Sequence, residues 1–157
     1  MLVGRYRARL LAFCEHLVRS REDAEDVVQE VFAAAFLAIL ANDRPINARA
    51  WLYRIARNRS LDHLRRTKAR GTDTNDRQYP DNTASTTDTA AVREELRAFV
   101  KHVQALPETQ RSALLLRELG GLSYEQIGHV MGRTIPSVKS LLVRARIALA
   151  ESSEPHA

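Results

Sequence analysis

The sequence has only one cysteine, Cys14, among its 157 residues. An internal disulfide is therefore impossible, which is typical of proteins that stay in a reducing compartment. Leu11 and Phe13 lie just before this cysteine in the sequence. We expect its thiol to act as a small apolar group in the core rather than as a redox sensor.

Long hydrophobic runs are also missing. The longest apolar stretch, VFAAAFLAILA at 31–41, is too short to cross a bilayer. The basic start of the chain is not followed by the clean apolar run of a signal peptide. We therefore expect a cytoplasmic protein with no membrane insertion.

Strand patterns are nearly absent, because apolar residues recur at helical spacing through most of the chain. This spacing predicts helices over about 2–18, 20–40, 48–66, 91–106 and 108–119, followed by two short helices. Residues 71–90 are rich in Thr, Asp and Asn and nearly free of large apolar residues, which is typical of a flexible acidic linker. The sequence thus predicts an all-α protein with two small helical domains, residues 1–70 and 91–157, joined by the linker 71–90.

Positive charge is concentrated in the first half of the chain. The formal net charge is +5 and the sequence pI is about 9.9. Residues 1–70 carry 14 basic and 8 acidic side chains, whereas residues 71–157 carry 10 and 11. A charge that served only solubility would be spread evenly, so a polyanionic partner is favoured.

Residues 122–149 have the pattern of a helix-turn-helix. Ser123 and Gln126 form a capping box, Gly132 supplies a left-handed residue that ends the helix, and Thr134 can cap the next one. The second helix is basic, with an outward face of small residues that suits the major groove. An ordinary helical hairpin is the alternative. The residues expected to bind duplex DNA are Arg133, Ser137, Lys139, Ser140, Val143 and Arg144.

The segment at 20–32 is an amphipathic helix whose outward face is acidic. Ser20 is its expected N-cap. Such a face is often simply solvated, but on a largely basic protein it can also bind a basic protein partner. The outward residues are Glu22, Asp23, Glu25, Asp26, Gln29 and Glu30.

The stretch WLYRIARNRSLDHLRRTKAR at 51–70 is strongly basic yet begins with the only tryptophan. Apolar residues lie on two sides of this helix, so we expect it to be wedged between neighbours with Trp51 in the core. The remaining strip consists of Arg54, Asn58, Asp62 and Arg65. Arginines suit phosphates and Asn58 suits a base edge, which favours binding to an opened strand.

Together, DAEDVVQEVF, WLYRIARNRSLDHLRR and ALPETQRSALLLRELGGLSYEQIGHVMGRTIPSVKSLLVRARIAL resemble an extracytoplasmic-function (ECF) sigma factor of bacterial RNA polymerase, in the sigma-70 family. The resemblance covers nearly the whole chain in the family's order. It implies that the first domain is region 2, which binds core polymerase and melts the −10 promoter element. The second domain would be region 4, which reads the −35 element. Leu141 departs from the family, in which arginine is common at this position.

The resemblance also implies which residues act. The contact with the β′ clamp helices would come from Asp23, Ala24, Glu25, Asp26, Gln29 and Glu30. The loop Asn42 to Ala48 would help to open the −10 element. The −10 set that we predict is Asn47, Arg54, Arg57, Asn58, Asp62 and Arg65, and the −35 set is the helix-turn-helix set given above. Expected partners are core RNA polymerase (β′ clamp helices and β subunit), promoter DNA and a cognate anti-sigma factor, which can hold such a factor at the inner membrane face.

Two other classes compete with this interpretation. A stand-alone helix-turn-helix regulator explains residues 122–149 but gives the acidic helix and residues 51–70 no role. An enzyme is the weakest class, because the five histidines are scattered without metal spacing or a nucleophile–base pair. We accordingly predict no catalytic residue, no metal and no cofactor.

Overall fold

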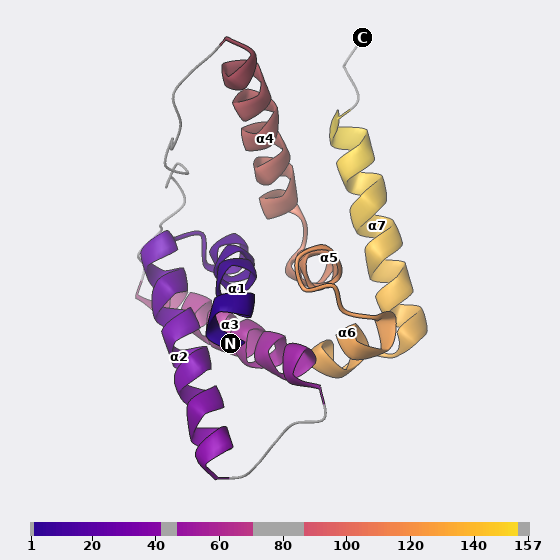
Figure 1. Ribbon diagram of the computed structural model, residues 1–157. Helices are drawn as coiled ribbons and strands as arrows, with labels where there is room; N and C mark the ends of the chain where they lie inside the picture. Colours follow the sequence, from indigo (N-terminus) through magenta and orange to yellow (C-terminus); the bar gives the residue numbers. More distant parts are fainter. Residues whose placement is uncertain (1, 42–46, 71–86, 154–157) are drawn as a thin grey trace.

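The computed structural model describes residues 2–41, 47–70 and 87–153, and in these residues it contains seven helices and no strand (Figure 1). The all-α prediction is therefore confirmed. The helices are α1 (Leu2–Val18), α2 (Arg21–Leu40), α3 (Ala48–Ala69), α4 (Thr87–Ala105), α5 (Glu108–Glu118), α6 (Tyr124–Met131) and α7 (Ile135–Ser153).

Helices α1, α2 and α3 pack together as the first domain. The Ser20 hydroxyl accepts a hydrogen bond from the Asp23 backbone N–H at 3.3 Å, which fixes the start of α2 as predicted. From α1, the side chains of Leu10, Phe13 and Leu17 are fully buried. Helix α2 contributes Val27, Val28 and Val31, and α3 contributes Leu52 and Ala56. Burial of these apolar side chains is what holds the three helices together.

The second domain ends in the predicted helix-turn-helix, formed by α6 and α7. The capping box between Ser123 and Gln126 is present, and Gly132 ends α6 with φ of 68° and ψ of 42°. The Thr134 hydroxyl accepts a hydrogen bond from the Ser137 backbone N–H at 3.3 Å. Val138, Leu142 and Ala145 then form the buried stripe of α7.

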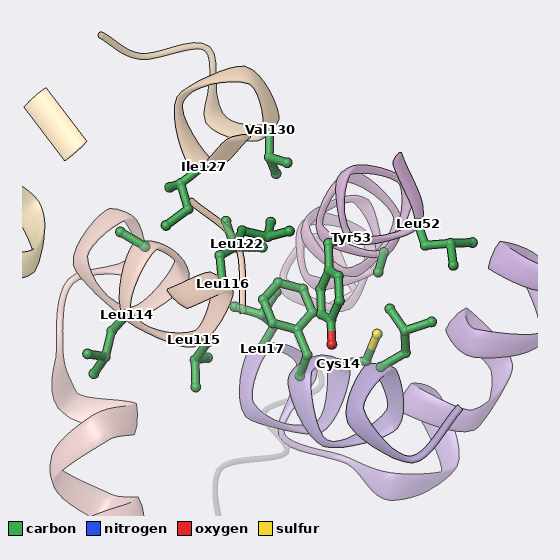
Figure 2. Close-up of a cluster of buried hydrophobic side chains, with 14 of the residues drawn as sticks. Cys14, Leu17, Leu52, Tyr53, Leu114, Leu115, Leu116, Leu122, Ile127 and Val130 are labelled. Carbon is green, nitrogen blue, oxygen red and sulfur yellow. The ribbon is translucent and has the colours of Figure 1, made fainter. Parts of the chain in front are cut away.

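The two domains lie against each other instead of standing apart. Helix α3 packs on α6, and α1 contacts α5. Figure 2 shows buried side chains from both domains in one cluster, with Tyr53 of α3 and Leu17 of α1 beside Leu116 and Leu122 of the second domain. Tyr53 is 1% exposed, and its ring lies 5.2 Å from that of Phe13 in an edge-to-face arrangement. The core is therefore continuous across the boundary between the domains.

The expected linker lies mostly outside the described residues, which omit 42–46 and 71–86. Helix α4 begins at Thr87, four residues before the helix expected from 91. Thr87, Asp88 and Thr89 give no apolar periodicity, so the sequence pattern could not place this start.

Candidate protein and nucleic-acid interfaces

The acidic face of α2 is largely exposed, but basic residues of the same domain pair with part of it. His63 Nε2 lies 3.2 Å from Asp23 Oδ2, and Arg59 lies 3.8 Å from Glu30, both from α3. Glu25 pairs with Arg21 on its own helix. On this face, the described side chains of Glu22, Asp26 and Gln29 are exposed and have no ion pair or hydrogen bond. Of the predicted polymerase contacts, Asp26 and Gln29 are thus the ones most open to a partner.

Ala24 does not belong to this exposed face. Its side chain is 0% exposed and lies in the core between the helices of the first domain. The prediction that Ala24 contacts a partner is therefore wrong as a surface contact. Its small side chain lets α2 pack closely, while its neighbours in the sequence point outward.

The polar strip of α3 lies on the surface as predicted. Arg54, Asn58, Asp62 and Arg65 are all exposed, and Arg65 donates to Asp62 Oδ1 at 3.4 Å. Asn47 caps α3, because its side-chain oxygen accepts the Ala50 backbone N–H at 3.1 Å. That oxygen is therefore engaged within the chain. Of the expected loop Asn42 to Ala48, residues 42–46 lie outside the described residues.

Arg57 differs from the other −10 residues that we predicted. Its side chain is only 12% exposed, and its Nη2 donates to Glu108 Oε1 of α5 at 2.9 Å. The Ser112 hydroxyl donates to the same carboxylate oxygen at 2.6 Å. The expectation that Arg57 lies open to a phosphate does not hold in this structure, since Arg57 is paired across the domain boundary.

The outward face of α7 carries the predicted duplex-binding residues. Lys139, Ser140, Val143 and Arg144 are exposed on the side away from the buried stripe. Arg133 is exposed and donates to the Ser137 hydroxyl at 3.1 Å. Leu141 is 5% exposed and belongs to the core. A leucine at this position supports the fold and offers no phosphate contact.

Sequence reasoning missed the residues that join the two domains. Arg19, the one described non-glycine residue with a positive φ (59°), donates to the Gln104 carbonyl at 2.7 Å. Arg57 was assigned to DNA, and no partner in the second domain was expected for Tyr53, which is one of the apolar residues of α3. The available signal was the second apolar side of α3. It indicated that another element covers this side, but not which element.

Neither a metal site nor a membrane span is visible in the described part of the chain. No group of three or more His, Cys, Asp or Glu residues there is arranged to hold a metal ion. None of the helices described is both long enough and apolar enough to cross a bilayer.

Comparison with known proteins assigns both domains. Residues 2–70 match the sigma-70 region 2 family, and residues 96–149 match sigma-70 region 4. The chain is similar to the RNA polymerase sigma-H factor of Pseudomonas aeruginosa, with 36% identity over 174 aligned residues that cover 99% of this chain and 86% of the relative. The ECF RNA polymerase sigma-E factor of Escherichia coli K12 is 33% identical over 165 residues, covering 99% of this chain and 86% of the relative. This chain belongs to the ECF sigma factors of the sigma-70 family.

Two solved structures resemble this sigma factor along 96% of its length. One is the sigma factor RpoE in complex with the anti-sigma factor NepR from Bartonella quintana, with a TM-score of 0.76, 28% identity and 92% of that chain covered. The other is CnrH in complex with the cytosolic domain of CnrY, with a TM-score of 0.68, 28% identity and 83% covered. The fold is thus that of a two-domain sigma factor.

Membership of the family decides between the function classes. Sigma factors act with core RNA polymerase in promoter-specific initiation and are not enzymes, so this chain is a transcription initiation factor. A stand-alone helix-turn-helix regulator is not favoured, because region 2 accounts for the whole first domain.

Proposed function

We propose that three exposed surfaces of different chemistry divide the work of this sigma factor. The acidic face of α2 binds core polymerase, the polar strip of α3 engages the opened −10 element, and the outward face of α7 reads the −35 duplex. The observation that carries the proposal is the presence of all three surfaces on one chain, one acidic, one mixed and one basic. Opposite charges on separate faces give each face a different class of partner.

The polymerase contact is assigned to Asp23, Glu25, Asp26, Gln29 and Glu30. Asp26 and Gln29 are central to it, because the other three already pair with basic residues of this chain. A basic partner helix would find two unpaired polar groups there and could compete for the weak, exposed pairs around them. The β′ clamp helices are the partner implied by the family, with the β subunit as a further contact.

The −10 contact is assigned to α3 and the segment before it. Arg54 and Arg65 would hold phosphates, and Asn58, exposed between them along the helix, would read a base edge. Asp62 is 3.4 Å from Arg65 and orients that arginine. Asn47 would act through its amide N–H₂ group, since its oxygen caps the helix.

The −35 contact is assigned to Arg133, Ser137, Lys139, Ser140, Val143 and Arg144. Arg144 suits a bidentate bond to guanine, and Val143 suits a thymine methyl group. Arg133, beside the turn, is better placed for a phosphate. The other five residues lie on α7, which would enter the major groove, as in other helix-turn-helix proteins.

The domain limits that we propose are 1–70 for region 2, 71–90 for the linker and 91–157 for region 4, although residues 87–90 of that linker already belong to helix α4. A cytoplasmic location and a cognate anti-sigma factor complete the proposal, because both similar structures are named as complexes with such inhibitors or their cytosolic part. The apolar side chains of Val92, Leu96 and Phe99 on α4 are about half exposed and offer a surface for such a partner.

Transcription reconstituted with core polymerase on a promoter library tests the division of work. We expect initiation from a subset of promoters that share a −10 and a −35 sequence. An Arg144→Ala variant should relax one −35 position, and an Asn58→Ala variant should relax one −10 position. Duplex binding without any initiation by core polymerase would contradict the proposal.

A further inference from the structure

Helix α3 meets the second domain through a partly buried ion pair. Arg57 and Glu108 lie 2.9 Å apart, with side chains 12% and 32% exposed, and Ser112 donates to the same Glu108 oxygen. Loss of one partner of an ion pair that is shielded from water leaves the other charge poorly solvated, so breaking the pair is costly. The contact therefore favours one arrangement of the two domains.

Tyr53 lies one helical turn before Arg57 on the same side of α3. Its hydroxyl is 3.4 Å from the Leu119 carbonyl, and a Cβ added to Gly120 would lie 3.4 Å from its ring. The second domain thus covers Tyr53 with Gly120, where the absence of a side chain lets the backbone approach the tyrosine ring. Separation of the domains would expose a large aromatic ring that is now 1% exposed.

A third contact lies at the end of α1. Arg19 donates to the Gln104 carbonyl at 2.7 Å, and Arg111, from α5, donates to the same oxygen at 2.8 Å. The residue that leaves α1 in a left-handed conformation therefore reaches the end of α4. Ionic, aromatic and backbone contacts together make a specific interface between the domains.

We propose that this interface, formed by Arg19, Tyr53 and Arg57 against Gln104, Glu108 and Leu119, is an intramolecular latch that holds the free factor closed. While it is closed, Glu108 occupies Arg57 and keeps its guanidinium from DNA phosphates. When the domains separate, Arg57 becomes available beside the exposed strip of α3. The consequence for DNA rests on the proposed −10 role of α3, whereas the closed state does not.

Substitution of Glu108 distinguishes opening of the domains from loss of a group that binds DNA. Substitution of Arg57 would open the latch and also remove a candidate phosphate contact. Glu108 is acidic and lies in the second domain, so its substitution opens the latch without loss of any group that binds DNA. Glu118→Lys is the matched control, because Glu118 is on the same helix and its pair, with Arg146 at 3.6 Å, lies within the second domain.

The distance between the domains can be measured on the full chain by single-molecule fluorescence energy transfer. Dyes are attached at Ala33→Cys on α2 and Glu151→Cys on α7, both exposed positions. Cys14 will not compete for the dyes, because it is fully buried. We expect one dominant closed population in the parent and a closed-to-open ratio lowered roughly tenfold in Glu108→Lys. Glu118→Lys should match the parent.

Two further variants keep the test decisive. Arg57→Glu combined with Glu108→Lys reverses the pair and should restore most of the closed population. Glu108→Gln keeps the side-chain shape and should open the factor in part, and circular dichroism will show whether α5 remains folded. Equal distance distributions in the parent and a folded Glu108→Lys variant would overturn the latch.

A binding measurement tests the consequence for DNA. We expect Glu108→Lys to bind a single-stranded −10 oligonucleotide several-fold more tightly than Glu118→Lys, which carries the same added charge. If Glu108→Lys opens the domains without that gain, the latch stands, but Arg57 and α3 do not have the proposed role in −10 binding. Failure of the latch and failure of the proposed −10 role of α3 therefore give different results.

Discussion

His63 Nε2 lies 3.2 Å from Asp23 Oδ2, so the helix assigned to DNA is tied to the helix assigned to polymerase. The second such contact, between Arg59 and Glu30 at 3.8 Å, lies two helical turns further along α2. Between them, Asp26 has no such partner in the described part of the chain. The acidic face is therefore divided into positions that fasten α2 to α3 and positions that are open to a second protein.

Asp26→Arg should weaken binding to core polymerase. A carboxylate that loses water at the interface is replaced by a charge that a basic partner repels, so we expect a loss of about 2 kcal/mol or more in binding free energy. Fluorescence titration of labelled sigma factor with core polymerase measures it. Glu151→Arg, with the same charge change on α7, should bind normally. Equal affinities of the two variants for core polymerase would show that the acidic face of α2 is only solvated.

Arg144→Ala should relax the choice of one base pair in the −35 element. Loss of a bidentate guanine contact costs about 1–3 kcal/mol on the preferred sequence and little on the others. Arg133→Ala should instead weaken binding to all sequences alike, because a phosphate contact carries no sequence information. Gel-shift affinities across single-base variants distinguish the two, and uniform losses in both variants would show that Arg144 is not the reader.

Asn58→Ala should reduce opening of the −10 element without weakening duplex binding. The amide is uncharged and releases no counterions from DNA, so it adds little to nonspecific affinity. Arg54→Ala is the control: it should lower affinity and reduce the salt dependence while base preference is kept. Permanganate reactivity of promoter thymines at matched occupancy measures opening. Unchanged opening in Asn58→Ala would assign base reading to the segment before α3.

Cys14 should resist thiol reagents until the first domain unfolds. Burial raises the pKa of its thiol to about 12, so the reactive thiolate is scarce at pH 8. We expect the modification rate to follow unfolding and to rise with denaturant, as measured with a chromogenic disulfide. Rapid labelling of the native protein would favour the redox-sensor alternative.

Gly128→Ala should destabilise region 4. A Cβ at this position would lie 2.6 Å from the Arg133 carbonyl oxygen, so the turn of the helix-turn-helix would have to shift. We expect a loss of about 1–3 kcal/mol in the free energy of unfolding together with weaker −35 binding. Gly4→Ala, where a Cβ meets nothing within 4 Å on an exposed helical position, should be neutral or stabilising. Thermal unfolding of both variants provides the comparison.

The sequence by itself determined the features that depend on neighbours a few residues apart. The Ser20 cap, the capping box of Ser123 and Gln126, and the left-handed Gly132 are local interactions, and each lies where the sequence pattern predicted it. The exposed strip of α3 and the buried stripe of α7 follow from helical periodicity alone. The same local patterns carry the family resemblance, which is why the function could be predicted.

Only the tertiary structure decided how the two domains meet. Arg57 and Glu108 are 51 positions apart, and Arg19 and Gln104 are 85 apart. Pairs at such separations leave no periodic signal, because their encounter depends on how whole helices pack. For the same reason, Arg57 was assigned to DNA, although its partner in the structure is Glu108 of the other domain. Ala24 was assigned to the polymerase contact from the family resemblance, which marks a whole segment, whereas helical periodicity places its side chain on the inner face of α2, where it is buried.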